Sequence, residues 1–140
     1  MSKLKEFPQS VIEKLNYYVY LLIDPITEEK FYVGKGNGNR IFAHLNNSLS
    51  NPKETDKIKQ IRQINKTGHE VRHIILRHGL TEKEALEVEA AAIDLLGLAK
   101  LTNIVSGHDS TERGWMSAED AIMELRAEKI YIVEPSILFE

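Results

Sequence analysis

The chain has 140 residues, a formal net charge of −3 and no cysteine, which excludes a disulfide framework and a thiolate metal site. Its 42% hydrophobic and 28% charged residues are typical of a globular protein, so we expect one domain, residues 1–140, with a single core. No apolar run reaches membrane-spanning length and the first ten residues lack the apolar core of a signal peptide, so we expect a cytoplasmic protein without a membrane partner.

The first third of the chain predicts a short helix within residues 1–16 and then a β-hairpin. The runs YVYLLI (18–23) and KFYV (30–33) are rich in β-branched and aromatic residues, and a polar loop separates them. Because side chains alternate along a strand, Tyr18 and Tyr20 are expected to share one face of the sheet. The opposite face then carries Val19, Leu21 and Ile23.

A glycine-spaced run, GKGNG at 34–38, follows the hairpin and predicts a turn. Asn37 or Asn39 is placed to cap a helix behind it. On that helix Arg40 and His44 stand at i and i+4 and share a face. The residues expected to pack inward are Ile41, Leu45 and Leu49.

A second helix is predicted from 53 to 66, with isoleucines at 58, 61 and 64 on one side and basic residues on the other. Thr67-Gly68 ends it. The basic side belongs to a wider asymmetry of charge: residues 33–78 carry nine Lys and Arg against three Asp and Glu, and residues 79–140 carry five against thirteen. Such a distribution suits a protein that meets phosphates with one face, although a solvated helix face explains it as well.

Two short patterns suggest a zinc site and a nucleotide-binding loop, but their sequence context fits neither. His69-Glu70-Val71-Arg72-His73 matches the H-E-x-x-H pattern of zinc peptidases, which requires a helix. Here a short buried strand is predicted at 71–76, and at about 3.3 Å per residue the two histidines would stand roughly 13 Å apart. The glycine run lacks the spacing of a dinucleotide site and the Gly-Lys-Ser/Thr of a phosphate-binding loop, so no nucleotide cofactor is expected.

A capping box formed by Thr81 and Glu84 opens a helix that is predicted to run to Gly97. Within it, Glu89 has only apolar residues at its i±3 and i±4 positions, and we expect it to face the core side. A buried carboxylate needs a cation or hydrogen-bond donors, so Glu89 is paired with a core arginine, lies at the solvated edge of the apolar stripe, or is available to a metal.

The last third of the chain predicts an extended piece around Asn103, a polar loop at 106–114, and a final unit that covers the core. That unit begins with a capping box at Ser117, continues as a helix to about Glu128 and ends as a strand at 130–133. The polar side chains that the loop offers are His108, Asp109 and Arg113. No sequence feature specifies an oligomeric state.

The order of these features resembles the GIY-YIG nuclease family, from about residue 17 to 104. Tyr18-Val19-Tyr20 stands where the family has Gly-Ile-Tyr, and Tyr32-Val33-Gly34 where it has Tyr-Ile-Gly. Tyr18 replaces the first glycine of the motif, which leaves Tyr20 in place. The helix residues Arg40 and His44, the glutamate helix with Glu89 and the late Asn103 match as well. The segments FYVGKG, RHGLTEKEA and SGHDSTERG resemble the branch of LEM-domain endonucleases and their bacterial relatives.

The resemblance implies a small, mainly antiparallel sheet of about three strands flanked by helices, an α+β fold with a C-terminal extension at 105–140. It implies that Tyr20 is a general base, that Arg40 holds the scissile phosphate and that Glu89 holds one Mg²⁺ or Mn²⁺. Because a phenol has a pKa of about 10, the base must be acidified by Lys35, by Arg40 or by the metal. Lys35 is also a candidate for binding substrate.

Three further residues complete the set that the resemblance implies. Tyr32 would orient phosphate or water, and His44 and Asn103 would position the site. Each has a plain structural alternative, as a packed hairpin or helix residue or as a partner for the backbone. We therefore expect a metal-dependent DNA endonuclease. The rivals are a non-catalytic nucleic-acid-binding module of the same fold and, third, a zinc peptidase using His69 and His73.

Overall fold

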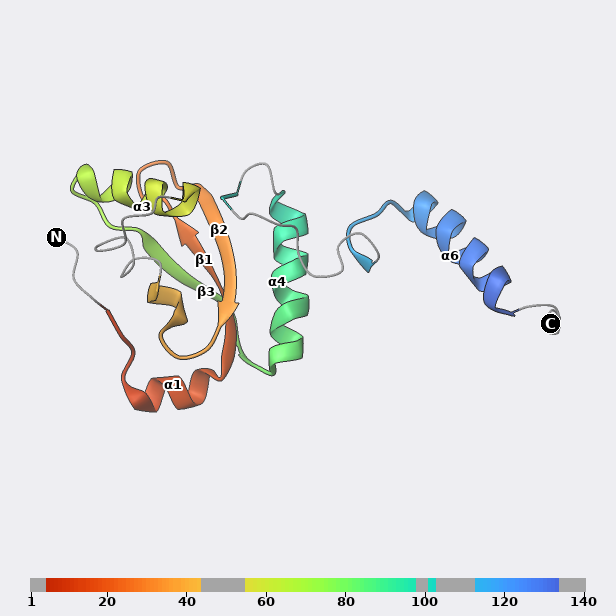
Figure 1. Cartoon of the computed structure of the whole chain (residues 1–140), viewed down its shortest axis with the longest axis horizontal. Helices are drawn as coiled ribbons and strands as arrows, with labels where there is room; N and C mark the ends of the chain where they lie inside the picture. The colour runs from red at the N-terminus through yellow and green to blue at the C-terminus, as the bar shows by residue number, and fades with distance from the viewer. Residues whose placement is uncertain (1–4, 44–54, 98–100, 103–112, 134–140) are drawn as a thin grey trace.

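The computed structural model describes residues 5–43, 55–97, 101–102 and 113–133. It has a three-stranded antiparallel sheet with the strand order β2-β1-β3, and helices lie against it (Figure 1). The predicted α+β class is therefore confirmed. The elements in chain order are α1 Gln9–Leu15, β1 Tyr17–Ile23, β2 Lys30–Gly36, the 3₁₀ helix η1 Arg40–Phe42, α3 Asp56–Lys66, β3 Arg72–Leu80, α4 Glu82–Leu96 and α6 Ala118–Val133.

The central strand β1 divides the core into two layers, as its alternation predicts. Tyr18, Tyr20 and Leu22 face one layer, which is completed by α1, η1 and two isoleucines of α3, Ile61 and Ile64. The other layer contains Val19, Leu21 and Ile23 of β1 together with apolar side chains of α4. Figure 1 shows α4 running beside β2, and α1 and α3 near opposite ends of the sheet.

Side-chain caps mark the starts of α3 and α4, and α3 begins three residues later than the predicted position 53. The side chain of Thr55 accepts a hydrogen bond from the backbone N–H of Ile58 at the start of α3, whose three isoleucines are buried. Thr81 and Glu84 form both bonds of the capping box that opens α4. Both helices therefore depend on local signals that the sequence carries.

The hairpin region differs from its prediction in one respect. β2 continues through Gly36, and Gly34 and Gly36 are strand residues, so the turn comes later, at Gly38 with φ of 57°. The side chain of Asn39 does not cap η1; its Oδ1 atom accepts a hydrogen bond from the backbone N–H of Phe7 at 2.6 Å.

The strand at 72–80 is longer and more exposed than predicted. In the described part of the chain β3 pairs with β1 alone, and all of its residues are exposed or half-buried, including Ile74 and Leu76. The expectation of a short buried strand was therefore wrong, because β3 lies at an edge of the sheet.

The C-terminal unit differs most from its prediction. The capping bond from the backbone N–H of Asp120 to Ser117 Oγ is present at 3.0 Å, but α6 continues as a helix to Val133, so no strand forms at 130–133. The described side chains of α6 include the exposed Ile122 and Met123, and Figure 1 shows the helix standing away from the sheet. The predictions of a terminal strand and of a cover over the core were both wrong.

Within the residues that the structure describes, no helix is both long enough and apolar enough to cross a membrane.

Candidate active site

The Tyr20 side chain is fully buried on the face of the sheet that also carries η1 and α3. Its cross-strand partner on β2 is Gly34. A Cβ atom at position 34 would lie 2.6 Å from both Cζ and Oη of Tyr20, which is closer than packed carbon and oxygen atoms approach. Glycine at position 34 therefore allows the phenol ring to lie across β2, and close approach, not a turn, explains this glycine.

A second glycine makes room for Arg40. A Cβ atom at Gly36 would lie 2.7 Å from Cβ of Arg40 and closer still to its Cγ, so the arginine stem packs directly on the β2 backbone. Tyr18 holds the segment around Arg40 in place. Its hydroxyl donates a hydrogen bond to the carbonyl of Gly38 at 2.6 Å and accepts one from the backbone N–H of Ile41 at 3.1 Å. The tyrosine that replaces the motif glycine thus positions the 3₁₀ helix that carries Arg40.

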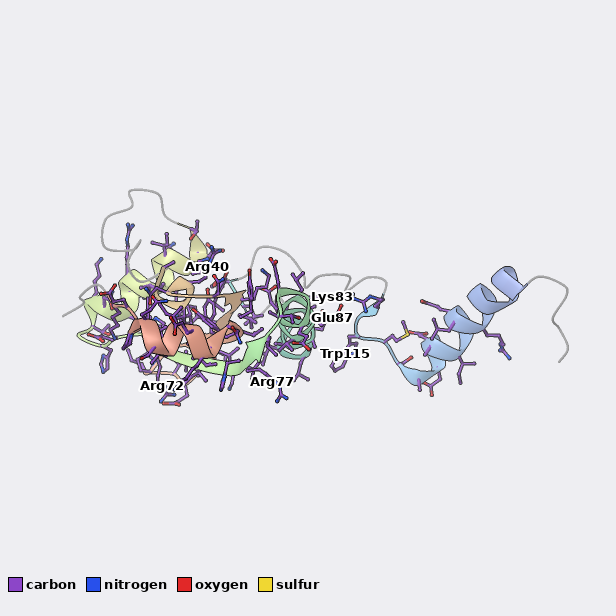
Figure 2. The ribbon with its side chains drawn as sticks, turned by 90° about the horizontal axis from the view of Figure 1, so that it is seen from below. Arg40, Arg72, Arg77, Lys83, Glu87 and Trp115 are labelled. Carbon is purple, nitrogen blue, oxygen red and sulfur yellow. The ribbon has the colours of Figure 1, made fainter. Side chains whose placement is uncertain are left out.

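Arg40 lies at the centre of a group of phenols. Burial raises the pKa of Tyr18, Tyr20 and Tyr32, and the charge of Arg40 opposes that rise at all three phenols, with a hydrogen bond to Tyr20 in addition. The Tyr20 ring centroid lies 6.0 Å from that of Tyr18 and 6.2 Å from that of Tyr32. Arg40 itself is exposed and, in Figure 2, lies near α3, on the other side of the view from Arg72 and Arg77.

Glu89 approaches this group from α4, the helix on the opposite layer. Its side chain is half-buried, and the residues one turn away on either side, Ala85 and Ile93, are buried. The negative charge of Glu89 raises the pKa of Tyr32, which lies on the edge strand β2. The structure therefore brings Tyr20, Tyr32, Arg40 and Glu89 near one another around β2, and their roles in catalysis stay a prediction.

The phenol that would act as base is not acidified by its protein surroundings. Burial is the largest effect on Tyr20 and raises its pKa well above the ordinary value, with a further increase from Tyr32. Arg40 acts in the opposite direction through its charge and its hydrogen bond but does not overcome the loss of solvation. A base at this position needs an additional positive charge.

Lys35 does not lie in this group. It pairs with Val19 in the register of the hairpin, on the layer that faces α4, whereas Gly34 and Gly36 on either side face Tyr20 and Tyr18. Its Nζ atom lies 3.6 Å from Oε2 of Glu82. Strand alternation sends the Lys35 side chain to the face opposite Tyr20, so Lys35 is not placed to acidify that phenol, and its role in binding substrate stays a prediction.

Two predicted site residues, His44 and Asn103, lie outside the described residues, as do Leu45, Leu49, His108 and Asp109. Arg113, from the predicted polar loop, forms an ion pair with Glu87, an exposed residue of α4. Figure 2 shows Trp115 beside this helix.

Sequence reasoning missed Lys57, which the structure adds to the group. Its Nζ atom lies 4.2 Å from the centroid of the Tyr32 ring, a cation–π distance. Burial and the nearby charge of Arg40 lower the pKa of Lys57 to about 8. The sequence signal was weak, because Lys57 is one of four basic residues on an amphipathic helix and only the packing of α3 distinguishes it.

The H-E-x-x-H segment does not form a helix. His73 lies within β3, where its ring centroid is 5.1 Å from that of Phe42, and His69 lies before the strand in contact with Thr67. The predicted conflict of context is therefore confirmed, and the helix that a zinc peptidase needs is not formed here.

Comparison with known proteins identifies the family of this chain. The profile of the LEM-3-like GIY-YIG domain matches residues 17–125. The chain therefore belongs to this family. The match includes all four residues of the group around β2.

The chain is also similar to the Ankyrin repeat and LEM domain-containing protein 1 homolog of Caenorhabditis elegans, with 30% identity over 122 residues. The similar region covers 71% of this chain and 17% of that protein, so the chain corresponds to a small part of its relative. No solved structure matches. The domain is thus of a nuclease type, and nucleic acid is the class of substrate that the family implies.

The donor set suits one kind of metal ion. Among the described residues there is no group of three or more His, Asp or Glu side chains that could enclose a metal. A single half-buried carboxylate, Glu89, fits a hard divalent cation such as Mg²⁺ or Mn²⁺, which binds one or two protein carboxylates and keeps water and phosphate oxygens as its other ligands. It does not fit a closed zinc site.

Proposed function

We propose that this domain is a DNA endonuclease that hydrolyses phosphodiester bonds with one divalent cation. The observation that carries the proposal is the convergence of Tyr20, Tyr32, Arg40 and Glu89 on the edge strand β2. A general base, a guanidinium and a carboxylate in one place are the groups that phosphodiester hydrolysis requires.

In this proposal Arg40 receives the scissile phosphate. It is exposed, and its planar guanidinium is suited to two phosphate oxygens at once. Arg40 also forms a hydrogen bond with Tyr20, so a phosphate bound to Arg40 would be separated from the phenol by the guanidinium alone. Movement of Arg40 onto the phosphate would uncover the hydroxyl of Tyr20, which the free domain buries completely.

Tyr20 then accepts the proton of the attacking water, and Tyr32 orients the water or the phosphate. Glu89 would hold the cation, which supplies charge stabilisation at a phosphate oxygen and the positive charge that a buried phenol needs in order to ionise. The high pKa of the free phenol is therefore a reason to expect strict dependence on the cation.

The direct test is nicking of supercoiled plasmid by the purified domain with Mg²⁺, Mn²⁺ or a chelator. We expect cation-dependent nicking that falls by about 100-fold or more in Tyr20→Phe and in Glu89→Gln. Glu87→Gln is the matched control, because Glu87 is an exposed carboxylate on the same helix, paired with Arg113 at the surface. It should retain activity within about twofold.

The rival is a domain that binds nucleic acid without cutting it. Binding of the plasmid with no nicking in any cation would favour that rival, and full activity in Glu89→Gln would remove the carboxylate from the mechanism. A panel of branched, nicked and linear DNA then identifies the preferred substrate, since phosphate contacts alone carry no sequence preference.

A further inference from the structure

The strongest feature of the site without an assigned role is Lys57 on α3. Its ammonium lies over the ring of Tyr32, which belongs to the proposed catalytic group. Lys57 is half-buried, and its ammonium lies over the face of Tyr32 at 4.2 Å from the centroid. The other lysines of α3, Lys59 and Lys66, are exposed. Packing therefore selects one lysine of this helix and directs it toward β2.

Among the residues that the structure describes, no carboxylate forms an ion pair with Lys57. Lys5 and Lys35, by contrast, each have a glutamate partner. The charged group that acts on it most is Arg40, of the same sign, from η1. A cation that is partly removed from water beside a second cation is unfavourable unless an anion joins them.

The geometry points to Lys57 as a second phosphate-binding cation of the active site, acting with Arg40 on the DNA backbone at the position of cleavage. This inference rests on the proposed nuclease function. The ring of Tyr32 holds the ammonium in place, and the compact ammonium donates to one phosphate oxygen while the guanidinium of Arg40 spans two. A single phosphodiester is the anion that satisfies both cations.

The lowered pKa of Lys57, about 8, agrees with this role, because an anion between the two cations would restore the charged form. Within the described part of the chain, the titratable and charged groups that act on Lys57 are Tyr32 from β2 and Arg40 from η1. Tyr32 stays neutral near pH 8, since burial and Glu89 raise its pKa.

The test compares Lys57→Met, which keeps the length of the apolar stem, with Lys57→Arg, which keeps the charge. We expect Lys57→Met to lower kcat by about 10- to 100-fold and Lys57→Arg to recover most of the loss. Lys14→Met is the control: Lys14 is exposed at the end of α1, outside the site, and its loss should leave cleavage within about twofold.

A second readout separates phosphate binding from packing. The affinity for a duplex is measured against salt concentration in a chelator, where no cleavage occurs. Loss of one phosphate contact should reduce the slope of log K against log salt by about one unit in Lys57→Met. Lys57→Arg should keep the slope, and the affinity of the wild type should fall above about pH 8 while that of Lys57→Arg does not.

The possible failures are distinguishable. If the wild type does not cut DNA, the proposed function fails, and the salt slope still reports whether Lys57 binds phosphate. If the wild type cuts and Lys57→Met cuts equally well with the same slope, only this inference is overturned. Equal losses in Lys57→Met and Lys57→Arg, with an unchanged slope and lowered thermal midpoints, would also overturn it, because they indicate a packing role.

Discussion

At the scale of single residues, the two strand glycines decide how close the side chains of Tyr20 and Arg40 can come to β2. Neither Gly34 nor Gly36 has a positive φ, so any residue could adopt their backbone conformation. A side chain is excluded because Tyr20 and Arg40 occupy the space in which the Cβ atoms of these two residues would lie. The glycines therefore belong to the site although they have no functional group.

Replacing Gly34 by alanine should reduce cleavage while the domain still folds. The added Cβ atom would displace the Tyr20 ring, so we expect cleavage to fall by at least tenfold, with a loss of about 1 to 3 kcal/mol in the free energy of unfolding. Gly38→Asn is the control, because nothing lies within 4 Å of a Cβ there and asparagine tolerates the φ of +57°. Nicking rates and urea unfolding measure both effects; an active Gly34→Ala would contradict the close-packing argument.

His73 should make the stability of the domain depend on pH. Burial lowers its pKa to about 4, against an ordinary value of 6.5, and the nearby charge of Lys5 acts in the same direction. Glu70 raises it in part. Between pH 6.5 and 4 the unfolded chain binds a proton that the folded chain does not, so the free energy of unfolding decreases as the pH falls through this window.

Replacing His73 by leucine should remove this effect. We expect the wild type to lose about 1 to 2 kcal/mol relative to His73→Leu between pH 6.5 and 4, with no relative change above pH 7. Chemical unfolding at a series of pH values measures the difference. Parallel curves for the two proteins across the whole range would show that His73 is not held neutral by burial.

At the scale of elements, η1 is a three-residue segment that depends on β1 for its position. The Tyr18 hydroxyl supplies two of its anchoring hydrogen bonds, to the Gly38 carbonyl and from the Ile41 N–H. Since Ile41 is buried, loss of the hydroxyl leaves its N–H without that acceptor. The element that presents Arg40 is thus held by a side chain from another strand.

Tyr18→Phe tests this dependence. We expect a loss of about 1 to 3 kcal/mol in stability and a lower kcat, because Arg40 is no longer held over Tyr20. Arg40 is not itself altered, so the affinity for duplex DNA should change less than kcat. Unchanged kcat in a folded Tyr18→Phe protein would show that η1 holds Arg40 without the hydroxyl.

At the scale of the whole molecule, the sequence was most informative where local rules apply. Alternation along β1 predicted the two core layers, and the capping box at Thr81 predicted the start of α4. The spacing of Tyr20, Tyr32, Arg40 and Glu89 resembled a known family and led to a group that the fold does bring together.

The wrong predictions share a physical cause, which is that tertiary packing decides between local alternatives. Glycines at 34 and 36 are compatible both with a turn and with a strand that other side chains approach closely. Because a turn was assumed, the alternation that places Lys35 on the face opposite Tyr20 was not predicted. The β-branched run at 130–133 has strand propensity, yet it continues the helix that Ser117 caps. Lys57 was missed because its direction depends on how α3 packs on the sheet.

The measurement that tests the central claim most directly is the position of Mn²⁺ in crystals of the domain, found by anomalous scattering. Tyr20→Phe crystals grown with a short duplex keep the substrate intact. We expect one Mn²⁺ bound to the carboxylate of Glu89, on the side toward Tyr32 and Arg40, and none in Glu89→Gln. A cation bound away from Glu89, with the DNA backbone on another face of the sheet, would contradict the account.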